Sequence, residues 1–160
     1  MIRDSRSLAH VAVGANLGDR ERTIAEAIRR MGALGTVEAV SPLIGTPAWP
    51  DPNVAPPYLN GAIALRTSLD SHALLRGLQE IEIALGRERP YRNAPRTIDL
   101  DLLLHEGRII VTPALILPHP RMHLRRFVLE PLAAIAPDAV HPVWGRTIAN
   151  LAAALPPGQP

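Results

Sequence analysis

Residues 87–104 read Arg-Glu-Arg-Pro-Tyr-Arg-Asn-Ala-Pro-Arg-Thr-Ile-Asp-Leu-Asp-Leu-Leu-Leu. The second part of this segment, residues 98–104, predicts a strand, because aliphatic residues alternate with others at positions 98, 100, 102 and 104. Asp99 and Asp101 then share the opposite face, with their Cα atoms about 6–7 Å apart and their side chains parallel. The predicted strand therefore has one apolar face and one face that carries paired carboxylates.

Four arginines precede this strand in a segment interrupted by two prolines: Arg87, Arg89, Arg92 and Arg96. Paired carboxylates suit Mg²⁺, which phosphoryl-transfer sites hold through one or two carboxylates and the substrate phosphates. Arginines bind such phosphates through bidentate, charge-assisted hydrogen bonds. The combination favours a site for a phosphate-bearing substrate. The alternative is an exposed strand face whose acids are neutralised by the arginines.

Composition narrows the chemistry. The chain has 160 residues, 47% of them hydrophobic, which fits one domain over residues 1–160 with a substantial core. It has no cysteine, which excludes thiolate metal sites and cysteine nucleophiles. All 17 basic residues are arginine, so a Walker-A loop, a protein-kinase lysine and Schiff-base chemistry are excluded as well. Any phosphate must be bound by arginine, metal and backbone.

The charge and hydropathy of the chain indicate which classes of partner it can have. The formal net charge is only +2 although the sequence pI is near 9.9, which does not indicate the basic patch that nucleic acids require. No stretch approaches 18 apolar residues, and the N-terminus lacks the apolar run of a signal peptide. We therefore expect a cytoplasmic monomer that acts on small molecules, with neither nucleic acid nor membrane as partner.

The first half of the chain predicts a strand at residues 8–13, a turn over residues 14–19, and a helix that Asp19 caps and that continues to Met31. A second strand is expected at residues 36–44, followed by a proline-rich loop at residues 45–57 that includes Trp49. A third strand at residues 58–66 places Tyr58 and Asn60 on one face. These two side chains could bind a planar heterocycle, or Tyr58 could simply pack beneath the loop.

The second half predicts a helix at residues 68–85, on which Gln79 and Glu82 project together from a polar face. A short strand at residues 108–111 is expected to form a hairpin with the aspartate strand. His119 and His123 have the spacing of a helical zinc pair, but the prolines around His119 and the lack of an acidic third ligand favour anion binding. Further helices are expected from Pro131 to residue 136 and over residues 147–155, the latter with Trp144 beneath it.

This order of elements is β-α-β-β-α-β, followed by a hairpin and C-terminal helices. It predicts an α+β protein with a ferredoxin-like antiparallel sheet that is flanked by helices. Such a fold hosts many activities, so it does not by itself identify a function.

Several motifs, in order and at matching spacing, resemble the 6-hydroxymethyl-7,8-dihydropterin pyrophosphokinase family. The most specific motif is Pro95-Arg-Thr-Ile-Asp-Leu-Asp-Leu102. The others are Val11-Ala-Val-Gly-Ala-Asn-Leu-Gly18, Thr46-Pro47, Tyr58-Leu59-Asn60, Gly86-Arg87, Leu117-Pro118-His119 and Phe127-Val-Leu-Glu-Pro-Leu132. The resemblance implies an enzyme of folate biosynthesis that transfers pyrophosphate from ATP to the pterin hydroxymethyl group, giving AMP and the pterin diphosphate.

The resemblance also implies roles for individual residues. Asp99 and Asp101 would hold two Mg²⁺ ions, and Arg87 and Arg96 would assist the transfer. The pterin would lie between Tyr58 and Phe127 and be bound at its edge by Asn60 and Thr46, near Pro47 and Trp49. The ATP side would comprise Gln79, Glu82, Arg89, Arg96, Leu102, His119 and Arg125. Loops 45–57 and 87–96 would close over the substrates.

The chain departs from some family members at four positions. Asn93 replaces a tryptophan in the arginine loop, and Pro120 replaces a tyrosine that can contact phosphate. Ala114 and Ile116 replace polar residues on the adenine side. These differences affect nucleotide affinity or preference, and they leave the paired aspartates and the pterin residues in place.

Two other functions remain as alternatives. A ferredoxin-like RNA-binding module would stack bases on sheet aromatics, but this chain has only five aromatic residues and lacks the K/R-G-F/Y signature of such modules. A pterin- or nucleotide-binding protein without turnover would keep the same binding residues. ATP consumption that depends on Mg²⁺ would distinguish the enzyme from both alternatives.

Overall fold

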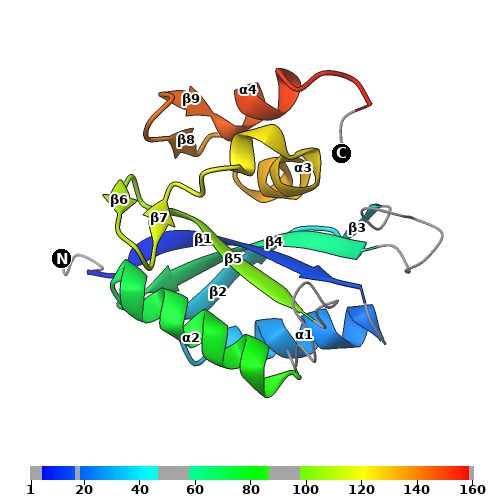
Figure 1. The fold of residues 1–160 in the computed structure, drawn as a ribbon, viewed down its shortest axis with the longest axis vertical. Helices are drawn as coiled ribbons and strands as arrows, with labels where there is room; N and C mark the ends of the chain where they lie inside the picture. The colour runs from blue at the N-terminus through cyan, green and yellow to red at the C-terminus, as the bar shows by residue number, and fades with distance from the viewer. Residues whose placement is uncertain (1–4, 17–18, 47–57, 87–97, 159–160) are drawn as a thin grey trace.

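The computed structural model describes residues 5–16, 19–46, 58–86 and 98–158 (Figure 1). The central antiparallel sheet has the strand order β2-β4-β1-β5, and a further short strand, β3, also pairs with β4. The strands are β1 Ser7–Ala15, β2 Thr36–Val40, β3 Ile44–Thr46, β4 Tyr58–Thr67 and β5 Asp99–His105. With helices after β1 and β4, this order is the predicted ferredoxin-like fold, which is therefore confirmed.

Helices α1 (Arg20–Met31) and α2 (Ser71–Ala84) cover one face of the sheet (Figure 1). Each helix begins where an aspartate caps it: Asp19 accepts the amide of Arg22, as predicted, and Asp70 accepts the amide of Ala73. Asp70 explains why α2 begins later than the expected residue 68. The apolar stripes of both helices pack on the sheet in a core that includes Ile24, Met31, Leu74 and Leu78.

The opposite face is covered by helix α3 (Arg126–Ile135), with the 3-10 turn η1 (Met122–Leu124) leading into it, and helix α4 (Ile148–Ala153) packs on α3 from outside (Figure 1). A second apolar cluster lies here and includes Leu103, Leu129 and Leu132. Two small hairpins complete the chain: β6 (Ile110–Val111) with β7 (Ile116–Leu117), and β8 (Val140–His141) with β9 (Arg146–Thr147). Among the described residues no helix combines the length and apolar character needed to cross a membrane.

The strand expected at residues 36–44 is two strands, β2 and β3, and this boundary prediction is wrong. The chain leaves the regular ladder at Ser41, whose side-chain Oγ accepts the amide of Ala62 at 2.8 Å. The next residue, Pro42, has no amide hydrogen to give to a ladder. At Ser41 the side chain therefore replaces one bond of the backbone pair, while the amide of Ser41 still donates to the carbonyl of Ala62 at 2.9 Å.

The expected hairpin between residues 108–111 and the aspartate strand is also wrong. Strand β6 pairs with β7, and the outer edge of β5 is instead approached by residues 117–119, where the amide of His119 donates to the carbonyl of Leu103 at 2.9 Å. The turn at residues 106–107 has positive φ at Glu106 and Gly107, which directs the chain away from β5. The β6–β7 hairpin thus carries His119 to the sheet.

Two C-terminal predictions need correction. Helix α3 begins at Arg126 and contains Pro131 in its interior, so Pro131 does not start the helix and removes one intrahelical hydrogen bond. Trp144 does not lie beneath α4. It is 54% exposed, and its ring approaches those of His123 and His141 at centroid distances of 5.4 and 6.2 Å.

The aspartate strand follows the predicted alternation only in part. Ile98, Leu100 and Leu102 lie in the core beneath α1 and α2, as expected. A register shift relative to β1 falls between the partners of His10 and Val11, so that Leu103 is the extra residue of a bulge. Leu104 consequently packs in the second cluster, on the face of the sheet opposite to that predicted.

Candidate active site

The paired carboxylates lie on the sheet face that α3 covers in part. Strand register puts Gly14 of β1 directly between Asn60 of β4 and Asp99 of β5. Residues paired across neighbouring strands point to the same face, and two strand spacings separate the outer Cα atoms by about 9–10 Å. Because Gly14 has no side chain, the floor between Asn60 and Asp99 is bare.

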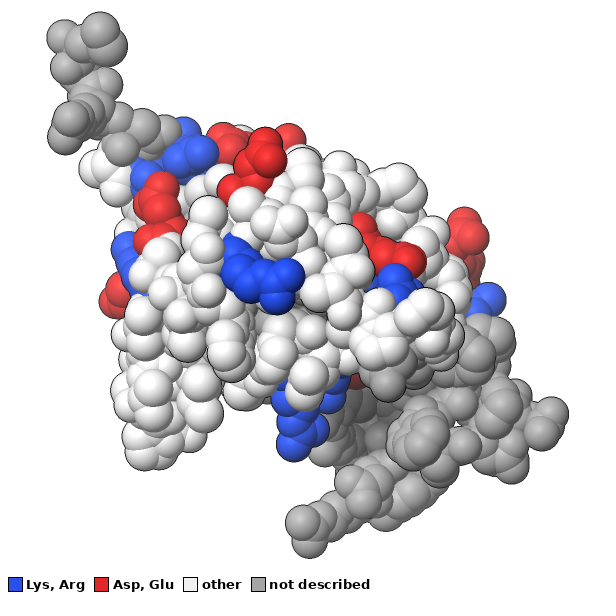
Figure 2. Space-filling model, turned by 90° about the horizontal axis from the view of Figure 1, so that it is seen from above, with Lys and Arg blue, Asp and Glu red and all other residues white. Residues whose placement is uncertain are grey.

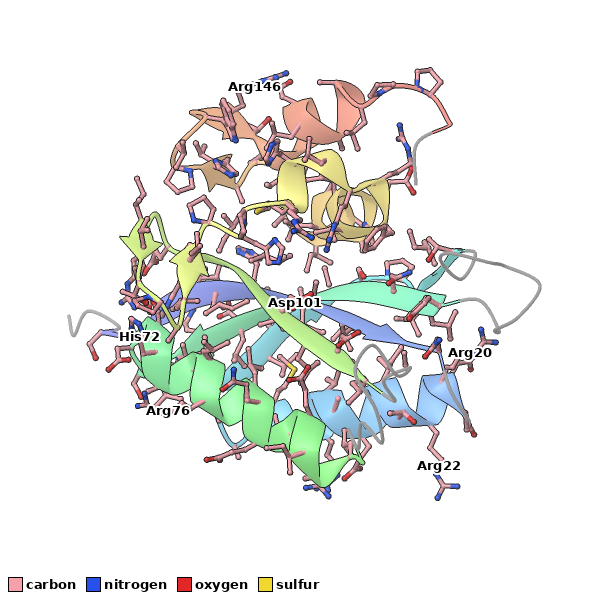
Figure 3. The ribbon with its side chains drawn as sticks, viewed as in Figure 1. Arg20, Arg22, His72, Arg76, Asp101 and Arg146 are labelled. Atoms are coloured by element: carbon pink, nitrogen blue, oxygen red, sulfur yellow. The ribbon has the colours of Figure 1, made fainter. Side chains whose placement is uncertain are left out.

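The next row of the same face repeats this arrangement. Ala12 of β1 pairs with Ala62 of β4 and with Asp101 of β5, so small side chains again lie between the two outer strands. Asp99 is half-buried, whereas Asp101 is exposed. Asp101 lies near the middle of the molecule, whereas Arg20 and Arg22 of α1 lie at its edge (Figure 3). The sheet therefore presents two acids beside a shallow, small-residue floor.

The other side of this floor carries polar and aromatic groups. Asn60 is 7% exposed, and its Nδ2 donates to Oγ1 of Thr46 at 2.8 Å. Thr46 pairs with Tyr58 across β3 and β4, so all three side chains share the face of Asp99. The sequence placed Tyr58 and Asn60 on one face, and the structure confirms it.

His119 borders the acids from the side of the β6–β7 hairpin. Its Nδ1 accepts the amide of Arg121 at 3.2 Å, which leaves the proton of a neutral ring on Nε2. Burial lowers the pKa of His119, Arg125 and Arg121 lower it further, and Asp101 opposes them. His119 is thus a neutral donor at neutral pH, close to Asp101 and to two cations.

The start of α3 supplies the remaining predicted groups on this face. Arg125 precedes the helix, and its guanidinium carbon lies 5.6 Å from the ring centroid of Phe127. Phe127 packs against the second apolar cluster. Helix α3 contacts β3 and β4, the strands that carry Thr46 and Asn60.

Gln79 and Glu82 do not share a polar face, contrary to the expectation. Gln79 is exposed on α2, but Glu82 is only 3% exposed and its Oε2 accepts the amide of Leu100 at 3.0 Å. Helix α2 covers the sheet face opposite to α3, so Glu82 reaches β5 from beneath and at its edge. No pattern in the sequence indicates this contact, since a lone polar residue in a helix is most often solvated.

Leu102 was expected on the nucleotide side, but its side chain lies in the core and is 4% exposed. Any contact with a ligand must therefore come from its backbone. The amide of Leu100 points away from β1, and Leu102, two residues further, has the same orientation in the ladder. Its backbone groups thus face the outer edge of β5.

Five predicted site residues lie outside the described residues: Arg87, Arg89, Arg96, Pro47 and Trp49. Their roles stay predictions, as do the roles of all the other predicted site residues. Gly14 is a residue whose importance the sequence prediction missed, because we assigned it to a turn, whereas it lies within β1. An isolated glycine in a strand is a signal for close approach by a ligand or a neighbouring chain, and that signal was present.

The two carboxylates are candidate ligands for a metal ion. In the described parts of the chain, no three His, Asp or Glu side chains gather as a metal cluster. This excludes a closed site made by these residues alone, but Mg²⁺ in phosphoryl-transfer enzymes needs only one or two carboxylates and completes its shell with water and phosphate. Asp99 and Asp101, oxygen ligands on one face of a strand, fit that requirement.

The surface seen from above the C-terminal helices carries charges of both signs, scattered over a largely uncharged area (Figure 2). A nucleic-acid interface would show arginines gathered in a patch or stripe. On this one face, the described residues show no such concentration.

Comparisons with known proteins identify the family of the chain. The family model described as 7,8-dihydro-6-hydroxymethylpterin-pyrophosphokinase (HPPK) matches residues 10–137. A protein of Methylorubrum extorquens named 2-amino-4-hydroxy-6-hydroxymethyldihydropteridine pyrophosphokinase is 40% identical over 151 residues, which cover 93% of this chain and 94% of the relative. The protein of the same name from Pseudomonas aeruginosa is 42% identical over 150 residues, 92% of this chain and 91% of the relative.

Solved structures show the same fold within longer chains. The wild-type HPPK-DHPS of Plasmodium falciparum matches 96% of this chain with a TM-score of 0.72 at 15% identity, and an HPPK-DHPS structure in complex with substrates matches 92% with a TM-score of 0.70 at 16% identity. This chain spans 45% and 43% of those two chains. The sequence match, the relatives and the fold agree: the chain belongs to the 7,8-dihydro-6-hydroxymethylpterin-pyrophosphokinase family.

Proposed function

We propose that this chain transfers the pyrophosphoryl group of ATP to the hydroxymethyl group of 6-hydroxymethyl-7,8-dihydropterin, giving AMP and the pterin diphosphate in folate biosynthesis. One observation carries the proposal. Asn60 and the two acids lie on the same sheet face, separated by a floor of glycine and alanine. This spacing of about 10 Å suits a flat ring bound at one end and phosphates bound at the other.

The pterin is proposed to bind at the β3–β4 side of the floor. The amide of Asn60 keeps Oδ1 as an acceptor while Nδ2 donates to Thr46, so it offers an acceptor to the ring N–H groups of a pterin. Tyr58 and Phe127 offer aromatic faces for stacking. The bare backbone at Gly14 lets a planar ring lie close to the sheet.

The triphosphate is proposed to bind at β5. Asp99 and Asp101 would hold Mg²⁺, two ions in the family's pattern, and the bound ions would neutralise phosphate charge and orient the reacting groups. His119 contributes its Nε2–H and Arg125 its guanidinium as donors to phosphate oxygens. Arg87, Arg89 and Arg96 would add cations from residues outside the described ranges.

The reaction forms a bond between the hydroxymethyl oxygen and the β-phosphorus of ATP. The bond from that phosphorus to the α,β-bridging oxygen breaks, AMP leaves, and the hydroxyl proton passes to solvent. The residues of this chain place the two substrates in line and stabilise the transferred charge, while Arg87 and Arg96 assist transfer. The cytoplasmic location and the monomeric state stay predictions from the sequence.

Product analysis tests the proposal. The chain is incubated with ATP, Mg²⁺ and 6-hydroxymethyl-7,8-dihydropterin, and AMP is resolved from ADP. AMP with a diphosphorylated pterin, abolished by EDTA and restored by Mg²⁺, is expected. ADP would mean transfer of a single phosphoryl group, and pterin binding without any product would mean a binding protein; either result contradicts the proposed activity.

A further inference from the structure

Glu82 closes the outer edge of the strand that carries the two acids. β5 is the terminal strand of the sheet and pairs only with β1 among the described strands. The amide of Leu100 points outward from this edge, where Oε2 of Glu82 accepts it at 3.0 Å. Glu82 is 3% exposed, so this is a buried, charge-assisted hydrogen bond in the place where a further strand would otherwise pair.

The contact of Glu82 with Leu100 acts on the backbone between the two acids. Leu100 lies between Asp99 and Asp101, and its own side chain is buried in the core beneath α1 and α2. Leu100 lies opposite Val13 of β1, but its own amide faces the outer edge, so the two residues form a pair without ladder hydrogen bonds. The backbone between the two acids is therefore held by the buried Leu100 side chain on one face and by Glu82 at the edge, and the directions of the two carboxylates follow from it.

We propose that Glu82 is a positioning residue for divalent-cation binding, acting through the backbone of Leu100 on Asp99 and Asp101. The inference rests on the cation of the proposed function and assigns Glu82 a place beneath the strand instead of a contact with nucleotide. Mg²⁺ tolerates little departure from octahedral geometry, so the angle between the two carboxylates matters. Groups that orient metal ligands from outside typically affect metal affinity 10–100-fold.

Two conservative variants separate this role from a direct charge effect. E82Q keeps the length of the side chain and an oxygen that accepts the Leu100 amide, but it removes the charge. E82D keeps the charge but withdraws the carboxylate by one carbon–carbon bond, about 1.5 Å. If reach to the backbone matters, E82Q resembles the unmodified chain and E82D does not. If the charge matters, E82D resembles the unmodified chain and E82Q does not.

Mn²⁺ binding to the full chain is measured by water-proton relaxation, once with Mn²⁺ alone and once with Mn²⁺ and ATP. Pterin is absent from both measurements. We expect E82D to weaken Mn²⁺ binding about tenfold and E82Q to change it less than about threefold. Amide exchange at Leu100, measured by NMR, should accelerate in E82D only. Glu80 lies exposed on the same helix, so E80Q and E80D are the matched controls and should change neither quantity.

Three results overturn the inference: Mn²⁺ binding unchanged in E82D, Mn²⁺ binding weakened equally in E82Q, or no Mn²⁺ binding by the unmodified chain. The proposed function fails separately. If the AMP assay is negative while E82D and E82Q differ as expected in Mn²⁺ binding, the positioning role stands and the pyrophosphoryl transfer does not.

Discussion

The two faces of the sheet are built from the same strands but differ in almost every property. Beneath α1 and α2, residues such as Val11, Ile63 and Leu78 are fully buried. On the face toward α3, the row of Asn60, Gly14 and Asp99 combines polar groups with a missing side chain. Alternation along each strand separates the two sets, so that one face supplies the main core, while the other combines the second apolar cluster with a row that lacks large side chains. Substitutions on opposite faces should therefore have separable effects.

The largest effect is expected on the sheet face toward α3, called the open face below, which carries Asp99 and Asp101. If the acids are the proposed metal ligands, D101A or D99A should lower kcat/KM for pyrophosphoryl transfer by more than about 100-fold, because loss of a direct ligand exceeds the 10–100-fold cost of an outer-shell partner. The melting temperature should change little, because neither side chain belongs to the apolar core. Steady-state kinetics and the melting temperature of the same preparations test this. A large fall in the melting temperature would mean that the acids hold the fold together.

On the sheet face beneath α1 and α2, called the closed face below, substitutions should lower stability and leave substrate binding unchanged. Leu78 of α2 is fully buried, so L78A should lower the free energy of unfolding by about 2–5 kcal/mol. The KM for each substrate, measured well below the melting temperature, should be nearly unchanged. Ile83 on the same helix is 71% exposed, and I83A should change stability by less than about 0.5 kcal/mol. Urea unfolding compares the two. A raised KM in L78A would show that the faces are coupled.

A polar network at one end of the closed face gives the third test. Ser7 and Ser71 contact the two ring nitrogens of His105 at 2.6 and 2.7 Å, and Arg108 joins the network at 3.0 Å from Nδ1. Burial, and to a lesser extent Arg108, lower the pKa of His105 to about 4, while Asp70 opposes the shift. His105 is 1% exposed. The folded state therefore contains His105 with a neutral ring.

The stability of the folded state should fall as the pH is lowered. Because the folded pKa lies below the unfolded value of about 6.5, the stability from neutral His105 is complete above pH 6.5 and declines as the pH falls toward 4. The full loss is about 3 kcal/mol at about 1.4 kcal/mol per pH unit. Urea unfolding from pH 7 to 4.5 should show this slope, and H105F should flatten it. An unchanged slope in H105F would assign the acid sensitivity to other groups.

The same contrast explains what the sequence could predict. The pairing of Asp99 with Asp101 on one face, the caps of α1 and the ferredoxin-like order depend on neighbours a few residues away, and local patterns encode them. The contact of Glu82 with the Leu100 amide and the pairing of β6 with β7 depend on how distant elements meet. Alternation alone could not predict the Leu103 bulge, because a bulge changes the face of every residue after it.

The candidate site divides in the same way. The roles of Asn60, Asp101 and His119 came from motifs, and register and contacts then placed these residues around one floor. The floor itself was missed because Gly14 was assigned to a turn, although it lies within β1. Its position between Asn60 and Asp99 becomes apparent only when β4 and β5 are seen on either side of it.

Gly14 therefore provides the smallest and sharpest test of the open face. A Cβ at Gly14 would lie 3.2 Å from Oδ1 of Asn60, which is a tight contact, and it would occupy the floor proposed for the pterin ring. Overpacking of this kind costs about 1–3 kcal/mol, so G14A should raise the KM for pterin about tenfold and leave the KM for ATP nearly unchanged. Gly45 of β3 is the matched control, because the nearest atom to an added Cβ there is 3.9 Å away. Equal rises in both KM values for G14A would mean that the substitution distorts β5 as well, and no rise in the pterin KM would place the ring elsewhere.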